Sequence, residues 1–227
     1  NKITIVMKKI LLSITFGAFM AAAATAQVGI KAGASFATIS EEDENVSQDD
    51  IENRSIVAPV IGLTFGMNVG DVLTIQPELL YTQNGGSNTF NVLGTETKTS
   101  YRINYLELPV LVKLQLGNSD GEGIGFHLAA GPWLGYALSG KYTTKTTADG
   151  NVLFDTEDNF TFDDKDDTER INYGMLGSAG VSFGKAVLDL RYNYGFNNLL
   201  DRDADNTNDN KPVRQTRSVA LTLGWMF

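Results

Sequence analysis

The C-terminal stretch of the chain, residues 218–227, reads SVALTLGWMF and alternates large apolar side chains with mostly smaller ones. The large side chains are Val219, Leu221, Leu223, Trp225 and Phe227, and those between them are Ser218, Ala220, Thr222, Gly224 and Met226. Successive side chains of a β-strand point to opposite faces, so this period of two predicts a strand with one broad apolar face.

The same alternation recurs through the rest of the chain. It is found at 28–40, 57–69, 72–82, 106–116, 124–138, 171–183 and 186–197, which with the C-terminal stretch gives eight predicted strands. These seven segments are at least 11 residues long, whereas strands of ordinary globular proteins average about 5–6 residues. Their length matches a tilted strand that crosses a membrane, roughly 9–11 residues with extensions.

The connections between the predicted strands alternate in length. Those at 70–71, 118–123 and 184–185 are short, and those at 41–54, 84–99, 140–168 and 198–212 are long and polar. This asymmetry is typical of an outer-membrane barrel with tight periplasmic turns, and a soluble β-sandwich gives no reason for it. We predict an all-β fold, an eight-stranded antiparallel up-and-down transmembrane β-barrel with long acidic extracellular loops. Closure of the sheet is required, because lipid cannot satisfy an open strand edge.

Aromatic residues follow the same plan. We expect an outward belt near the long loops and a second belt near the short turns, at the two headgroup levels. The first contains Tyr81, Tyr105, Tyr136, Tyr173 and Tyr194, and the second contains Phe126, Phe183, Trp225 and Phe227.

Three motifs resemble a known family. Residues 105–113 (YLELPVLVK), 28–33 (VGIKAG) and 73–83, with its Pro-Glu-Leu, are similar to strands of the PorT-like or "porin family" outer-membrane β-barrel proteins of Bacteroidota. The resemblance covers essentially all of 27–227 and implies the outer membrane of a Gram-negative bacterium, but it is nearly silent on activity. The terminal Phe227 resembles the signal read by the barrel-assembly machinery, which is therefore an implied partner.

The N-terminal region has the features of a secretory signal. Met7, Lys8 and Lys9 precede an apolar run over 10–24, which closes on Ala24-Thr25-Ala26. The run is shorter than the roughly 20 residues that a membrane-spanning helix needs. We expect residues 1–26 to be a signal peptide, starting at Met7 and cleaved after Ala26, and residues 27–227 to form the barrel domain.

Composition excludes several functions. The 227 residues include no Cys and one His, and the net charge is −9. These counts exclude disulfides, thiolate metal sites and a Cys nucleophile, and the negative charge argues against a nucleic-acid partner. The single histidine, His127, is predicted to face inward near the periplasmic rim. A hydrolase acting on outer-leaflet lipid needs its base at the other end, so we predict no enzyme activity.

The predicted inward faces carry six charged residues. They are Lys31, Glu78, Glu107, Lys113, Asp189 and Arg191, three of each sign. The interior of an eight-stranded barrel is just wide enough for side chains to fill, and buried charges are tolerated when they are paired. We predict that the six form an ion-pair network that fills the lumen. A narrow path for ions or small solutes is the alternative.

The long loops are rich in acidic residues. Asp201, Asp203 and Asp205 have the one-three-five spacing of a calcium loop, but Asn206 replaces the expected Gly and Pro212 stands where a bidentate Glu belongs. We therefore expect no dedicated cofactor, only weak Ca²⁺ or Mg²⁺ binding at the acidic loops, which could bridge to lipopolysaccharide. Residues 142–162 alternate enough to predict a hairpin turning at 149–150, whose exposed edge could recruit a protein partner.

Two classes of function follow from this pattern. The first is a non-enzymatic structural or binding module that acts through its extracellular loops. The second is a small porin-like channel for ions or small solutes.

Overall fold

The computed structural model describes residues 27–42, 52–92, 94–117, 123–148, 150–160, 170–197 and 213–227. Within these ranges the strands are β1 (Gln27–Glu42), β2 (Glu52–Arg54), β3 (Ile56–Asn68), β4 (Leu73–Val92), β5 (Thr95–Gly117), β6 (Ile124–Ala148), β7 (Asn151–Phe160), β8 (Ile171–Phe183), β9 (Ala186–Gly195) and β10 (Val213–Met226). No helix in the described ranges is long and apolar enough to cross a membrane. The predicted signal peptide, 1–26, lies outside the described residues.

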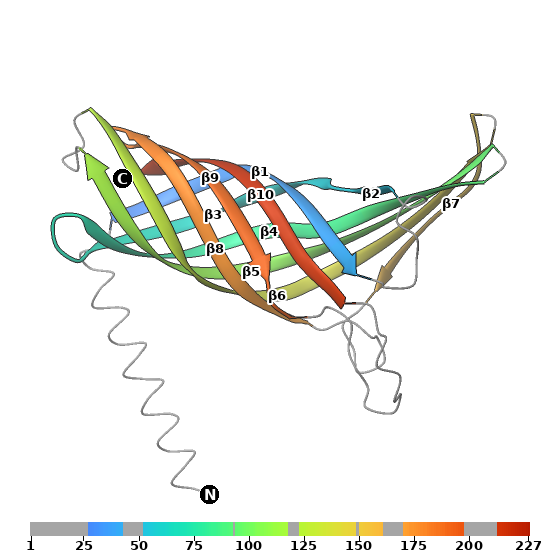
Figure 1. Cartoon of the computed structure of the whole chain (residues 1–227), viewed down its shortest axis with the longest axis horizontal. Coiled ribbons are helices and arrows are strands. Elements are labelled where there is room, and N and C mark those ends of the chain that lie inside the picture. Colours follow the sequence, from blue (N-terminus) through green and yellow to red (C-terminus); the bar gives the residue numbers. More distant parts are fainter. Residues whose placement is uncertain are drawn as a thin grey trace, which may run out of the picture.

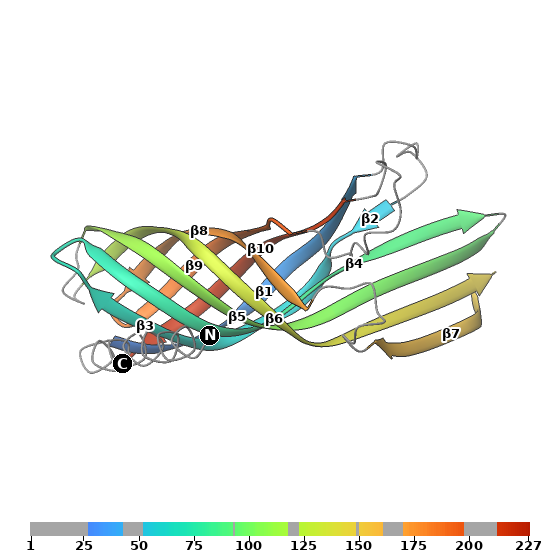
Figure 2. The ribbon, with the colours of Figure 1, turned by 90° about the horizontal axis from the view of Figure 1, so that it is seen from below.

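Eight of the described strands close into a barrel (Figures 1 and 2). They follow the order β1, β3, β4, β5, β6, β8, β9, β10, and β10 pairs back on β1, with Trp225 opposite Ile30 and Val219 opposite Phe36. All neighbours in the ring are antiparallel. The predicted eight-stranded up-and-down barrel is confirmed, and its closed sheet presents no strand edge to lipid.

The predicted alternation sets the two faces of the barrel wall. On β5, Leu106, Leu108 and Val110 are 38–48% exposed on the outside, while Glu107 and Leu111 are 1% exposed in the lumen. A surface this apolar has to face lipid rather than water. The apolar side chains that a soluble protein would bury therefore lie on the outside of this one.

Both aromatic belts are present, with one correction. Tyr81, Tyr136 and Tyr173 are exposed on the outer wall, as are the four aromatic residues at the short-turn end. The prediction for Tyr105 is wrong, because this side chain is 0% exposed and lies in the lumen. The physical reason is simple parity: Leu106 faces outward, so its neighbour on an extended strand faces inward.

The short turns are confirmed at Gly70 and Gly184, both of which have positive φ values (95° and 59°) that glycine adopts without strain. The turn at 118–123 lies mostly outside the described residues.

The interpretation of 84–99 as a loop is wrong. β4 and β5 pair without interruption as far as Val92 opposite Thr95. The hairpin predicted within 142–162 is confirmed, because β6 runs to Ala148 and β7 returns from Asn151.

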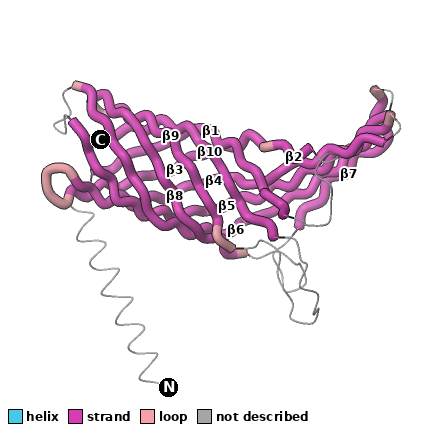
Figure 3. Tube along the Cα trace, in the orientation of Figure 1, coloured by secondary structure: helices cyan, strands magenta, loops and turns pink. Residues whose placement is uncertain are grey.

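Beyond the barrel, these paired strands continue as a single sheet. It contains β2, residues 84–92 of β4, residues 95–103 of β5, residues 140–148 of β6, and β7, in that order. We call this sheet the overhang. Figure 3 shows β4, β5 and β6 running from the barrel wall into the overhang without a break. It leaves the barrel at the end opposite the short turns, which is the extracellular end.

Candidate functional site in the lumen and the overhang

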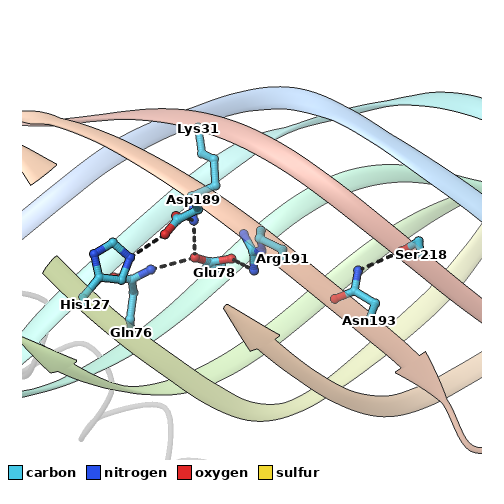
Figure 4. Close-up of polar contacts among 8 residues, drawn as sticks. All are labelled: Lys31, Gln76, Glu78, His127, Asp189, Arg191, Asn193 and Ser218. Carbon is cyan, nitrogen blue, oxygen red and sulfur yellow. Dashed lines mark hydrogen bonds and ion pairs between the residues drawn. The ribbon is translucent and has the colours of Figure 1, made fainter. Parts of the chain in front are cut away.

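Four charged side chains meet in the lumen (Figure 4). Lys31 Nζ on β1 lies 2.9 Å from Glu78 Oε1 on β4 and 2.8 Å from Asp189 Oδ2 on β9. Arg191 Nη2, also on β9, lies 2.6 Å from Glu78 Oε2. Each of the four residues is at most 3% exposed. Two cations and two carboxylates thus compensate one another in a site closed to solvent, the arrangement in which buried charge is tolerated.

Two further residues, Gln76 and His127, complete this group and were absent from the predicted network. Gln76 Nε2 donates to Glu78 Oε1 at 2.7 Å, and His127 Nε2 lies 2.5 Å from Asp189 Oδ1. We call the six residues Lys31, Gln76, Glu78, His127, Asp189 and Arg191 the lumen cluster.

Gly180 makes the His127–Asp189 contact possible. It is the cross-strand partner of both residues, opposite His127 on β6 and opposite Asp189 on β9. A Cβ at Gly180 would lie 2.5 Å from His127 Cε1 and 2.6 Å from Asp189 Oδ1. Two features of the sequence could have identified this contact. His127 has the parity of an inward-facing residue, and Gly180 lies on the strand between those of His127 and Asp189.

Glu107 and Lys113 do not join the lumen cluster, so the network is smaller than predicted. Glu107 Oε1 accepts hydrogen bonds from Thr82 Oγ1 at 2.7 Å and Asn84 Nδ2 at 3.2 Å, and the described residues give it no ion pair. Lys113 lies six residues nearer the periplasmic end of β5, about 20 Å along the strand. The two charges share a face but stand at different heights, which a count of inward charges cannot reveal.

The lumen on the extracellular side of the cluster contains two buried groups of apolar side chains. Leu111, Ala129, Trp133 and Leu176 form one buried group, and Val60, Leu80 and Ala220 form another. The Trp133 indole N–H donates to the carbonyl of Met175 at 3.2 Å, which holds the ring in place. This part of the lumen is therefore packed with side chains, as expected for a barrel of eight strands.

The periplasmic end, in contrast, is hollow. A cavity of about 540 Å³ is lined by polar residues that include Asp71, Gln76, Lys113, Gln115 and Lys185. Gln76 belongs both to this lining and to the lumen cluster, so the cluster closes the inner end of the cavity. The cavity lies at the periplasmic end of the barrel, and the packed lumen lies behind it.

The overhang offers a different kind of site. Its last strand, β7, pairs with β6 and with no other described strand. The tip carries Val152, Leu153 and Phe154, each more than half exposed, and Asp155 and Glu157 follow. An exposed strand edge with apolar and acidic side chains is suited to contact with another chain.

No group of three or more His, Asp or Glu side chains that could hold a metal ion occurs among the described residues. The calcium-like spacing at Asp201, Asp203 and Asp205 falls outside those residues. That prediction stays untested.

The closed antiparallel ring, the lipid-facing apolar wall and the side-chain-filled interior define a small transmembrane β-barrel of the outer membrane. Comparison with protein families agrees, because residues 20–201 match the outer membrane protein beta-barrel domain. The chain belongs to this family, and the protein is located in the outer membrane of a Gram-negative bacterium.

Solved structures of small barrels are similar to this chain at low identity. The outer membrane protein OprG of Pseudomonas aeruginosa is 12% identical, with a TM-score of 0.46 over 89% of this chain and 96% of that one. Neisserial surface protein A is 13% identical, with a TM-score of 0.40 over 88% and 97%. Ail of Yersinia pestis, in complex with a heparin analogue, is 12% identical, with a TM-score of 0.37 over 89% and 99%. No curated protein matches the chain.

Proposed function

We propose that this outer-membrane barrel is not an enzyme and that it acts as a structural or binding module, presenting its overhang to a partner protein. The observation that carries the proposal is the open edge of β7, which stands beyond the barrel wall (Figure 1). The backbone N–H and C=O groups of such an edge can pair with an extended segment of another chain. The overhang thus supplies the hydrogen-bonding groups that strand addition requires.

The side chains of β7 define the chemistry of that partner. Exposed Leu153 and Phe154 favour apolar contacts, and Asp155, Glu157 and Asp158 favour cations. The partner segment would be extended, with apolar and basic residues. Two copies of β7 would place acidic strands side by side, which is unfavourable, so self-association through this edge is disfavoured.

The lumen supports a binding role more than transport. The lumen cluster joins β1, β4, β6 and β9 across the interior, and Trp133 and its apolar neighbours fill the next layer. A small channel is the second candidate, and the observation in its favour is the periplasmic cavity of about 540 Å³. Conduction would require displacement of both the paired charges and the apolar layer.

The proposal also includes the origin of the protein, its assembly partner and weak metal binding. The resemblance of residues 105–113 to PorT-like strands supports an origin in Bacteroidota, and the strand ending at Phe227 would be the signal for the barrel-assembly machinery. Asp201, Asp203 and Asp205 would contribute to weak Ca²⁺ or Mg²⁺ binding by the acidic loops, with no dedicated cofactor.

Site-specific photo-crosslinking on intact cells tests this function. A photoreactive side chain at Leu153, on the β7 tip, should give a discrete protein adduct, and one at Lys185, in a periplasmic turn, should not give that adduct. Deletion of residues 142–162 should abolish pull-down of the crosslinked partner by the protein, while the heat-dependent gel shift shows that the barrel is still folded. Failure of Leu153 to give any discrete adduct, together with open current steps in a bilayer, would replace the binding role with the channel.

A further inference from the structure

Four cations gather on one face of the overhang of this acidic protein. Arg102 on β5 lies opposite Lys141 on β6, and Lys98 lies opposite Lys145. Directly opposed residues project on the same side of a sheet, so each pair brings two positive charges together. Like charges in that position are destabilising. We call Lys98, Arg102, Lys141 and Lys145 the cationic patch.

The cationic patch lies on the face that continues the lipid-facing wall. Leu106 faces outward, and Arg102 and Lys98 follow it at intervals of four residues on the same strand. An even interval keeps the side chains on one face. Arg102, Lys98 and Lys145 are exposed, and the Lys141 side chain is 41% exposed. The four cations are therefore accessible from the side of the barrel that lipid surrounds.

The height of the patch can be worked out from the aromatic belt. Leu106 lies opposite Tyr136, which belongs to the extracellular belt. Arg102 is four residues farther along β5, about 13 Å along the strand and roughly 10 Å in height for a strand tilted by 35–45°. That height is outside the hydrocarbon core and at the outer edge of the headgroup region, which is about 5–8 Å deep in each leaflet, so a long Arg102 side chain can reach back to the headgroups. Lys98 is four residues farther along β5 than Arg102, so it lies roughly another 10 Å above it.

Neighbouring acids compensate only half of the patch. Lys141 Nζ lies 2.5 Å from Glu157 Oε1 on β7, and Lys145 lies opposite Asp155. Among the residues that the structure describes, the cations of β5 have no such partner on the adjacent strands. On the β4 side, Arg102 faces Gly85 and Lys98 faces Thr89.

Within the patch, Arg102 Nη1 donates to the neutral Gln83 Oε1 at 3.1 Å, which fixes the guanidinium without neutralising it. The acid nearest to Lys98 in sequence is Glu96, two residues away on the same strand. Positive charge thus remains on the β5 side of the patch, at the Arg102 guanidinium above all.

We propose that the cationic patch binds the phosphate groups of lipopolysaccharide in the outer leaflet. A phosphate between Arg102 and Lys141 replaces their mutual repulsion with charge-assisted hydrogen bonds, and the arginine fork matches phosphate oxygens. Lys98 and Lys145 meet anionic groups farther from the hydrocarbon. The lipid-facing direction and the headgroup height select a membrane phosphate over a soluble one. This inference is independent of the proposed partner at β7.

The test compares lipid A with and without its phosphates. The refolded barrel in detergent is titrated with each lipid, and binding is followed by native mass spectrometry and by the shift of the unfolding temperature. Phosphorylated lipid A should bind and stabilise the barrel, and the dephosphorylated lipid should not. The K98Q/R102Q variant should bind phosphorylated lipid A about tenfold more weakly or worse, the loss expected for charge-assisted contacts.

Two controls make the outcome decisive. K185Q removes one positive charge at the periplasmic end and should bind as the wild type does, and the heat-dependent gel shift reports that each variant is folded. Inorganic phosphate at the same concentration should not compete. The proposal is overturned if K98Q/R102Q binds phosphorylated lipid A like the wild type, if both lipids bind equally, or if inorganic phosphate competes fully.

Discussion

Replacement of Lys31 by Met tests the energetic role of the lumen cluster. Lys31 is 3% exposed, and its ammonium lies within 2.9 Å of carboxylate oxygens of both Glu78 and Asp189. Without it, Glu78 keeps the Arg191 guanidinium, but Asp189 loses its ammonium partner and keeps only the contact with His127. Breaking a buried ion pair by removing one partner costs about 3–5 kcal/mol, because the remaining charge is uncompensated. We expect K31M to lower the free energy of unfolding by that amount.

The double variant K31M/D189N separates charge balance from packing. It removes one cation and one anion, so Glu78 and Arg191 remain as a balanced pair. We expect the double variant to be no less stable than K31M, a strongly non-additive result. Reversible urea unfolding in lipid vesicles, followed by tryptophan fluorescence, measures these free energies. K185M, at an exposed turn, is the control and should change stability by less than about 0.5 kcal/mol. A K31M loss below about 1 kcal/mol, or simple additivity in the double variant, would refute the reasoning.

Two further predictions concern the wall and the overhang. A Cβ at Gly131 would lie 2.0 Å from the carbonyl oxygen of Val110, whereas one at Gly177 would meet nothing within 4 Å. In the same unfolding assay G131A should therefore cost about 1–3 kcal/mol more than G177A, and equal losses would contradict the packing of β5 against β6. Deletion of residues 142–162 should leave the heat-dependent gel shift intact and the unfolding free energy within about 1 kcal/mol of wild type, because the described residues of this segment pair within the overhang and the barrel ring closes without them. Loss of the folded band would show that the overhang is needed for the barrel.

The membrane strands could be predicted from the sequence because lipid imposes a strict pattern on them. Leu106, Leu108 and Val110 are outside because each crossing strand needs an apolar outer face. The β4–β5 part of the overhang was missed, whereas its β6–β7 hairpin was predicted, because residues 84–99 show no apolar face. Residues 95–100 (TETKTS) carry no hydrophobic alternation, and their pairing follows from the strands on either side.

The sequence was less informative about which charged side chains pair inside the lumen. The parity of β5 and β9 predicts which charges face inward, but pairing depends on height along the barrel axis, which follows from the register of all eight strands. Glu107 and Lys113 share a face yet do not meet, whereas His127 and Asp189 meet across Gly180. The register is set by turns and bulges, such as the shift between Asn104 and Tyr105, which no single segment reveals.

The closed lumen is the central claim, and single-channel recording tests it most directly. The refolded chain from Gln27 to Phe227 is placed in a planar bilayer, with and without calcium, after the heat-dependent gel shift has shown that it is folded. We predict a silent bilayer, because the paired charges of the lumen cluster and the buried side chains around Trp133 occupy the interior that an ion would have to cross. Stable open steps would contradict it and would make transport the leading function.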